Sequence, residues 1–407
     1  MGCLVKALLM TLSPMSVDLA YAISRTLTHA TQGRTPYSVF IGAVIAFWGT
    51  LPVDHPSILT GWTVDFFQPS FGLYLLVFLL KLPLLVLDLL TGVLIYRISL
   101  NAGVSEHKAA VAFSLWFLNP YVMLTNEMWG SVEILPTFLL VLVYAFSRTR
   151  KGQIGAAFTY AAATAVKLFP VILLPIYPAV FRARRKLSLM FVLACALGVG
   201  TYFGWVSFAG YNPWFQLRQY NLFTQYFDEY VISTTGGIQV GLATIALILT
   251  YVLIAERWPR DERASFDGAL LILLVFMAFT SWFPQSLIWL IPFLILDVAF
   301  GDRSIAYLIV LLSSAFFFDI VAFYPYFTAN SSAFFFIPAK DYVTKSVVAA
   351  YETFAKADAN VLFGGPFARA LFSATCIVYS LKLIEKRTGL ISTLQKLLFY
   401  GDVGGSG

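Results

Sequence analysis

The sequence predicts an all-α membrane protein that crosses the bilayer many times. Of its 407 residues, 59% are apolar and only 12% are charged, whereas soluble domains have apolar and charged shares near one half and one quarter. Long apolar runs are separated by short charged clusters, and the strands of a membrane β-barrel would instead alternate polar and apolar residues. Together these features exclude a disordered chain, a collagen and a nucleic-acid-binding domain.

The apolar runs define the expected helices. Runs of roughly 16 to 27 residues, a length that can cross a bilayer, lie at 72–98, 108–126, 131–147, 187–207, 236–255, 266–283, 285–300, 303–323 and 366–383. A short apolar stretch at the N-terminus predicts a short first helix. The stretch 154–181 contains Lys167 and three prolines, so we expect two shorter helices that meet at a turn. The total is about 10–12 transmembrane or half-spanning helices.

The basic residues orient these helices. When alternate loops are placed on the same side, one face collects 18 of the 27 Lys and Arg residues, among them Lys6, Lys108, Arg148 and Arg263. The positive-inside rule makes that face cytoplasmic. The turn at Lys167 then lies at the outer surface. The long connections 15–71, 208–235 and 324–365 also lie outside, and the first of them carries two pieces suited to the membrane interface. An alternative topology makes 37–53 the first span and leaves the later assignments unchanged.

The predicted organisation is a single transmembrane domain over 1–400 with a flexible tail at 401–407. Within it, Lys81 and Asp88 are seven residues apart on one helix, so they share a face that should turn inward. Three scattered histidines and three distant cysteines give no metal-ligand spacing.

Several charged side chains on the predicted outer face are candidates for binding or chemistry. Asp18 follows the first apolar stretch, and Glu133 begins an apolar helix, where it is either functional or an acid that the helix dipole favours. Lys167 needs a partner within an apolar region: either a lipid phosphate, or headgroups or a nearby acid. Arg218 lies among aromatic residues and could bind phosphate or anchor the interface.

Ordered short motifs then resemble the GT-C superfamily of glycosyltransferases that use polyprenyl-phosphate sugars. The similarity is to archaeal and bacterial mannosyltransferases and to the catalytic subunit of GPI mannosyltransferase 1. It rests on Leu87-Asp88 to Tyr96-Arg97, Trp116-Phe117-Leu118-Asn119-Pro120, Trp129-Gly130-Ser131-Val132-Glu133, Val166-Lys167-Leu168-Phe169-Pro170, and Ser281-Trp282-Phe283-Pro284-Gln285 continuing through Trp289 to Pro292.

This resemblance implies a catalytic aspartate in the first outer loop. Asp18 and Tyr21, followed by Gly33 to Tyr37, resemble the family's Asp-x-x-x-Tyr and Gly-x-x-Pro-Tyr stretch, so Asp18 is the first choice. Asp65 is the second and Asp54 the third. The expected substrate-binding residues are Glu127, Trp129, Glu133, Lys167, Arg218, Tyr220, Trp282 and Gln285.

The implied reaction moves a sugar from a polyprenyl-phosphate donor to an outward-facing glycolipid or glycan acceptor with inversion, and the expected sugar is mannose. No resident cofactor is expected, a divalent metal is not favoured, and a small membrane partner subunit is compatible. The membrane is the plasma membrane of a prokaryote or the endoplasmic reticulum of a eukaryote. Two alternatives stay open: a transporter or flippase of lipid-linked sugars, for which only one broken segment is found, and a non-catalytic subunit of a glycosyltransferase complex.

Overall fold

The computed structural model describes most of the predicted membrane-embedded part of the chain. The described residues are 2–12, 43–44, 46–47, 50–52, 71–128, 130–149, 151–177, 185–208, 231–233, 239–259, 261, 263–280, 284–301, 305–329 and 365–393.

Within these ranges the chain is helical apart from one short hairpin. The elements in chain order are α1 (Gly2–Leu12), α4 (Phe71–Asn101), α5 (Glu106–Phe117), α6 (Pro120–Val122), η2 (Met123–Met128), α7 (Ile134–Ser147), α8 (Gln153–Val166), η3 (Phe169–Leu173), α10 (Arg185–Phe208), β1 (Val231–Ser233), β2 (Gln239–Gly241), α12 (Leu242–Arg257), α13 (Ala264–Phe279), η4 (Pro284–Trp289), α14 (Ile291–Ala299), α15 (Ile305–Ala329) and α18 (Gly365–Thr388). The all-α prediction is confirmed.

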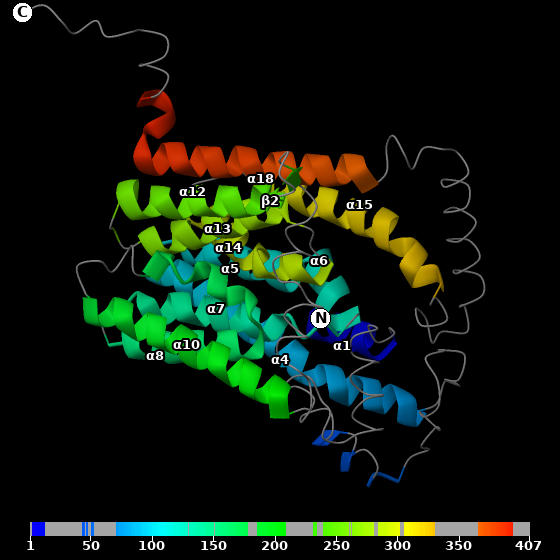
Figure 1. Ribbon diagram of the computed structural model, residues 1–407. Helices are drawn as coiled ribbons and strands as arrows, with labels where there is room; N and C mark the ends of the chain where they lie inside the picture. The colour runs from blue at the N-terminus through cyan, green and yellow to red at the C-terminus, as the bar shows by residue number, and fades with distance from the viewer. Residues whose placement is uncertain are drawn as a thin grey trace, which may run out of the picture.

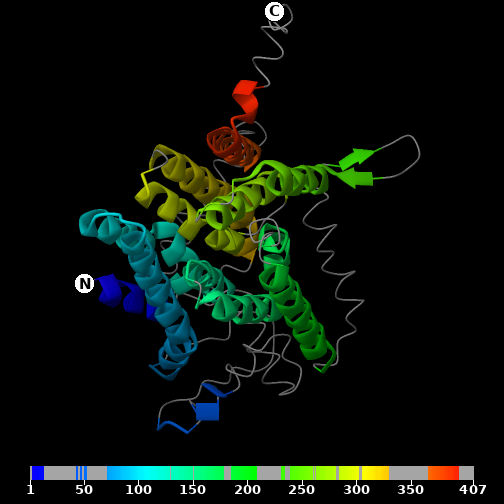
Figure 2. The same ribbon diagram turned by 90° about the vertical axis from the view of Figure 1, so that its left-hand side faces the viewer.

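The helices pack as a bundle that contains two groups of neighbouring helices. The α8 helix packs against α7 and α10 on one side, and α18 packs against α13 and α15 on the other (Figure 1). The central helix α13 is apolar all round and buried along nearly its whole length, as expected for a helix surrounded by others. The antiparallel strands β1 and β2 pair Val231 with Gly241 and project from the bundle (Figure 2).

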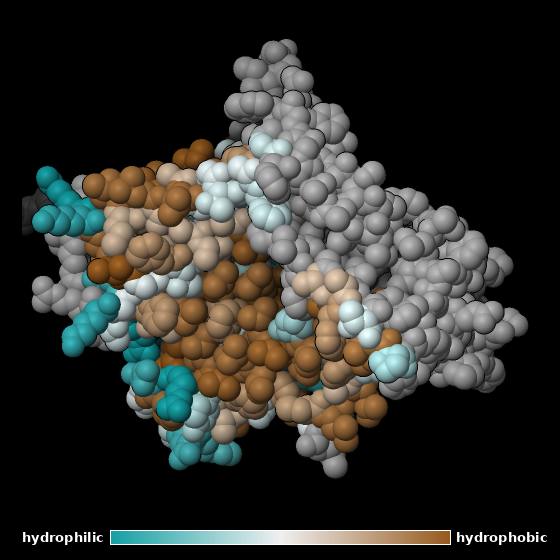
Figure 3. Space-filling model, turned by 90° about the horizontal axis from the view of Figure 1, so that it is seen from below, coloured by the Kyte–Doolittle hydropathy of each residue, from teal (hydrophilic) through white to brown (hydrophobic). Residues whose placement is uncertain are grey.

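Three described helices are long and apolar enough to span a membrane: residues 75–101, 185–205 and 367–388. Five shorter apolar helices accompany them. Figure 3 shows a broad apolar surface, with hydrophilic residues gathered along one edge. An apolar surface of this extent is what lipid contact requires, because water would penalise its exposure.

Some predicted runs match single helices, whereas 108–126 is divided among α5, α6 and η2, and 285–300 between η4 and α14. The run 72–98 is α4, and 187–207 is α10. The predicted break within 154–181 is confirmed, because α8 ends at Val166, Lys167 has an extended backbone with φ −153° and ψ 143°, and the 3₁₀-helix η3 follows. Pro83 lies inside α4, where it removes one backbone donor without ending the helix.

Candidate functional site

The first component of the site is Glu133, which the local backbone holds at the start of α7. The π-helix η2 ends at Met128, and Gly130 has a φ of 69°, a left-handed conformation that favours glycine. The backbone N–H of Glu133 then donates to Ser131 Oγ over 3.3 Å. Its carbonyl accepts from Thr137 Oγ1 over 2.7 Å. The turn before α7 and the first bonds of that helix therefore fix the backbone position of Glu133.

The second component is Lys167, at the end of α8. Its N–H still donates to the carbonyl of Ala163 over 3.1 Å, but its extended backbone ends the helix. Pro170, near the start of η3, prevents α-helix from continuing. The sequence break thus places a lysine at a helix end instead of along a helix face.

These two side chains meet each other and a third from a distant segment. Lys167 Nζ forms an ion pair with Glu133 Oε1, and Trp289 Nε1 donates to Glu133 Oε2 over 2.8 Å. Lys167 Nζ lies 5.3 Å from the centroid of the Trp289 ring. The Phe169 and Trp289 rings stack with centroids 3.6 Å apart and an interplanar angle of 2°. Four residues from three motif segments therefore form one cluster.

The exposure of this pair is uneven. The Glu133 side chain is 4% exposed, whereas that of Lys167 is 35% exposed. We call Glu133 and Lys167 the open pair. An ammonium and an indole N–H together hold the Glu133 carboxylate in one orientation. A partly exposed lysine can also approach an anion that arrives from outside, because its flexible stem and three donors tolerate a range of geometries.

A second lysine–carboxylate group lies within the bundle, and it corrects one prediction. Lys6 Nζ contacts Asp88 Oδ2 at 2.5 Å and Glu127 Oε1 at 3.0 Å, and all three side chains are fully buried. The placement of Lys6 on the cytoplasmic face is therefore wrong. A lysine in an apolar helix must find carboxylate partners inside the bundle, because burying an unpaired charge is costly. We call Lys6, Asp88 and Glu127 the sealed cluster.

Neighbouring polar groups complete the sealed cluster. Asn126 Nδ2 donates to Asp88 Oδ1 over 3.5 Å, and Trp116 Nε1 donates to the Asp88 carbonyl over 3.0 Å. Lys81 Nζ donates to the carbonyl of Met10 over 3.3 Å. Lys81 and Asp88 both turn inward, as their spacing predicted. These contacts fasten α1 to α4 and η2.

The structure places the remaining predicted site residues as follows. Glu127 lies in the sealed cluster and not with the open pair, and Gln285 is partly buried in η4, the 3₁₀-helix that also carries Trp289. The other predictions fall outside the described residues: Asp18, Asp54, Asp65, Trp129, Arg218, Tyr220 and Trp282. Their roles stay predictions.

Trp289 is the contact that sequence reasoning missed. It lies within the motif that runs from Ser281 to Pro292, but the motif alone does not assign it a role in the site. Its distance of 156 positions from Glu133 gives no local signal of their hydrogen bond. Among the described residues, no group of three or more His, Cys, Asp or Glu side chains could hold a metal ion.

Comparison with known proteins bears on this region. Residues 63–235 match the family model of the GPI transamidase subunit PIG-U. The match covers less than half of the chain but includes Glu127, Glu133 and Lys167. No curated protein matches.

One solved structure that resembles the chain is described as the crystal structure of ArnT from Cupriavidus metallidurans bound to undecaprenyl phosphate. It has 16% sequence identity and a TM-score of 0.48, and the alignment covers 94% of this chain and 75% of that one. A likeness of this size carries no functional argument. The family match and the long apolar helices support a multi-pass integral membrane protein.

Proposed function

We propose that the protein transfers a sugar from a polyprenyl-phosphate donor to an outward-facing glycolipid or glycan acceptor, and that this sugar is mannose. The observation that carries this proposal is the convergence of Glu133, Lys167 and Trp289. These residues come from three of the short motifs that resemble the GT-C superfamily. Motifs far apart in the chain that meet around a partly exposed cation favour a binding site over three independent packing features.

In the proposed reaction, Lys167 binds the phosphate of the lipid donor. An acceptor hydroxyl oxygen forms a bond to the anomeric carbon while the bond from that carbon to the phosphate oxygen breaks. The bonding electron pair leaves with the lipid phosphate, and Lys167 stabilises the growing negative charge. A carboxylate, Asp18 in this proposal, accepts the hydroxyl proton. A phosphate leaving group needs little protonation, so no separate general acid is required.

Glu133 holds Lys167 in this account, and Trp289 in turn holds Glu133. Both oxygens of Glu133 already accept hydrogen bonds, which fixes the carboxylate and limits the directions that Lys167 can take. Glu133 is then a positioning residue, and a contribution to binding acceptor hydroxyls would use its remaining lone pairs.

The test is turnover by the purified full-length protein with polyprenyl-phosphate-mannose and a glycolipid acceptor. We expect release of polyprenyl phosphate together with a mannosylated acceptor. Asp18→Asn should abolish turnover while leaving thermal unfolding unchanged. Activity that survives in Asp18→Asn but is lost in Asp65→Asn would move the base to Asp65. If both variants retain activity, the carboxylate mechanism is wrong.

A second candidate is favoured by the family match, which names a GPI transamidase subunit. In this case the chain would be a membrane subunit that holds a glycolipid within a larger complex and does not itself transfer sugar. Purification under mild detergent would then recover stable partner chains, and Asp18→Asn would not change the activity of that complex. An isolated, monomeric protein with turnover of its own would exclude this candidate. Translocation of labelled lipid in liposomes without product formation would instead favour a transporter.

A further inference from the structure

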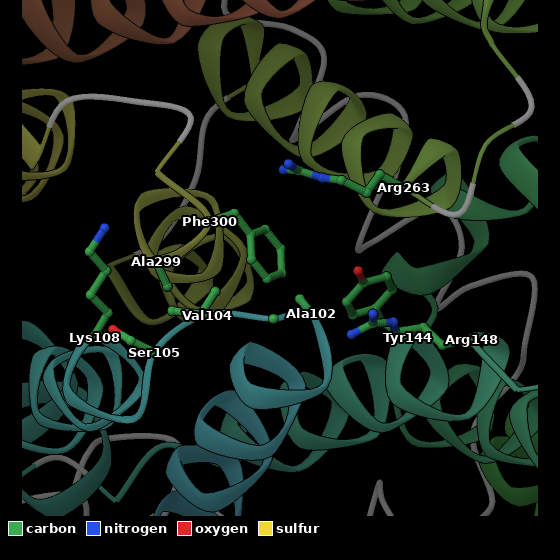
Figure 4. Close-up of a pocket in the computed structure, with 10 residues that line it drawn as sticks. Ala102, Val104, Ser105, Lys108, Tyr144, Arg148, Arg263, Ala299 and Phe300 are labelled. Atoms are coloured by element: carbon green, nitrogen blue, oxygen red, sulfur yellow. The ribbon is translucent and has the colours of Figure 1, made fainter.

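A cavity of about 420 Å³ lies at the opposite end of α7 from Glu133. Its walls come from the loop after α4, the first turn of α5, the end of α7, the start of α13 and the end of α14 (Figure 4). Glu133 and Arg148 flank α7 at its two ends, so at 1.5 Å per residue about 22 Å separates them along the axis. The cavity is therefore distinct from the open pair.

The charged residues that line the cavity are all cations: Lys108, Arg148 and Arg263. The same three residues were assigned to the predicted cytoplasmic face by the alternation of loops, and their common cavity agrees with a shared end of the bundle. None of the lining residues is acidic. A concave surface with a single sign of charge focuses the field and attracts a ligand of opposite sign.

The two arginines are held in place by the protein. Arg148 donates to the carbonyls of Ile98 and Asn101, each over 3.1 Å. The guanidinium of Arg263 lies 4.7 Å from the Phe300 ring centroid, 3.5 Å from Asp297 Oδ1 and 3.6 Å from Asp267 Oδ1, and Asp267 is also paired with Arg387. Fixed guanidinium groups lose little entropy when they bind an anion. Asp297 also accepts from Tyr379 Oη over 2.5 Å, so its charge is shared with a second donor.

Backbone donors add to this positive surface. The helix α5 begins next to the cavity, and its N-cap residue Ser105 makes no side-chain capping hydrogen bond. Uncapped first-turn N–H groups and the positive end of the helix dipole favour an anion. Lys108, which lies in the same first turn, is exposed at the cavity edge.

From these features we propose that the cavity binds a phosphate group at the end of the bundle that the basic residues assign to the cytoplasm. The cavity volume is within the range of small-ligand sites. Two sources share this chemistry: the headgroup of an anionic phospholipid in the cytoplasmic leaflet, and a soluble phosphate ester or inorganic phosphate. Either would bind independently of the sugar-transfer chemistry proposed for the outer face.

The test uses the full-length protein purified with equal amounts of phosphatidylglycerol and phosphatidylcholine, with retained lipid counted by native mass spectrometry. We expect preferential retention of phosphatidylglycerol, and loss of the Lys108 charge in Lys108→Ala should weaken it about five-fold. Lys151→Ala is the matched control, because Lys151 is an exposed lysine near Arg148 that does not line the cavity. Ala102→Trp should also reduce retention, because it fills the cavity without changing its charge.

A second arm identifies the source of the phosphate. Displacement of phosphatidylglycerol by millimolar inorganic phosphate or pyrophosphate would assign the cavity to a soluble phosphate, and retention in their presence would assign it to the lipid. Equal retention of both lipids by the wild-type protein with no saturable binding of phosphate would overturn the proposal. An equal loss in Lys108→Ala and Lys151→Ala would also overturn it, because the effect would then be one of overall charge.

Discussion

The molecule contains two lysine–carboxylate groups whose surroundings differ. In the sealed cluster, Lys6 touches both Asp88 and Glu127, and none of the three side chains is exposed. In the open pair, Glu133 is almost as buried, but about a third of the Lys167 side chain is exposed. The same two residue types therefore occur once within the packed bundle and once at its edge.

Because the two groups differ in exposure, we infer that they have different roles. An ammonium enclosed by carboxylates cannot reach a ligand without unpacking α1 from α4 and η2, so the sealed cluster holds helices together. An ammonium that is partly exposed can exchange part of its interaction with Glu133 for one with an incoming phosphate. Three mutations test this division, from the largest expected effect on stability to the smallest.

Lys6→Ala should have the largest effect on stability. It leaves two buried carboxylates without their shared cation, and breaking a buried ion pair in this way costs about 3–5 kcal/mol. The measurement is the free energy of unfolding in mixed micelles titrated with SDS. Lys151→Ala, an exposed lysine in the described part of the chain, is the control and should change it by less than about 0.5 kcal/mol. Equal values for the two variants would show that the sealed cluster does not hold α1.

Glu133→Gln should cost less, about 1–2 kcal/mol, because Lys167 can turn to water when its partner loses charge. The glutamine side chain keeps an oxygen that can accept from Trp289. The same SDS titration measures the change in the free energy of unfolding. We expect the rate of sugar transfer to fall by a larger factor than this loss of stability accounts for. A decrease in the free energy of unfolding as large as that of Lys6→Ala would mean that the open pair also holds helices together.

Trp289→Phe should have the smallest effect, about 1 kcal/mol from loss of the indole N–H bond to Glu133. The phenylalanine ring can keep its stack on Phe169. We expect weaker binding of the donor, measured as a higher KM with kcat less affected, because Lys167 is then held less firmly. An unchanged KM would remove Trp289 from the site.

Long helices such as α4 and α10 were predictable because each membrane span is specified by an apolar run within its own segment of the chain. An apolar run must satisfy its backbone within the helix, so α4 and α10 begin and end near the limits of their hydrophobic runs. The turn at Lys167 was also predictable, because a charge and prolines interrupt an apolar stretch. Of the alternatives raised for Lys167, the structure shows an ion pair with a nearby acid, Glu133.

Contacts between distant segments were not predictable in the same way. Lys6 was counted among the basic residues of the predicted cytoplasmic face, and nothing near it in the chain reveals Asp88, which lies 82 positions away. Likewise, nothing near Trp289 in the chain reveals that its indole N–H donates to Glu133, 156 positions away. Side-chain pairing depends on how helices pack, and periodicity alone does not specify which faces meet.

The most direct test of the proposed function removes the open pair without leaving an unpaired buried charge. The double variant Glu133→Gln/Lys167→Met is compared with Lys151→Met and the wild-type protein for release of polyprenyl phosphate from polyprenyl-phosphate-mannose. The double variant should fold, but its turnover should fall about 100-fold or more, because the leaving phosphate loses its cation. Lys151→Met should keep wild-type turnover. Wild-type turnover in the double variant would contradict a role for the open pair in sugar transfer.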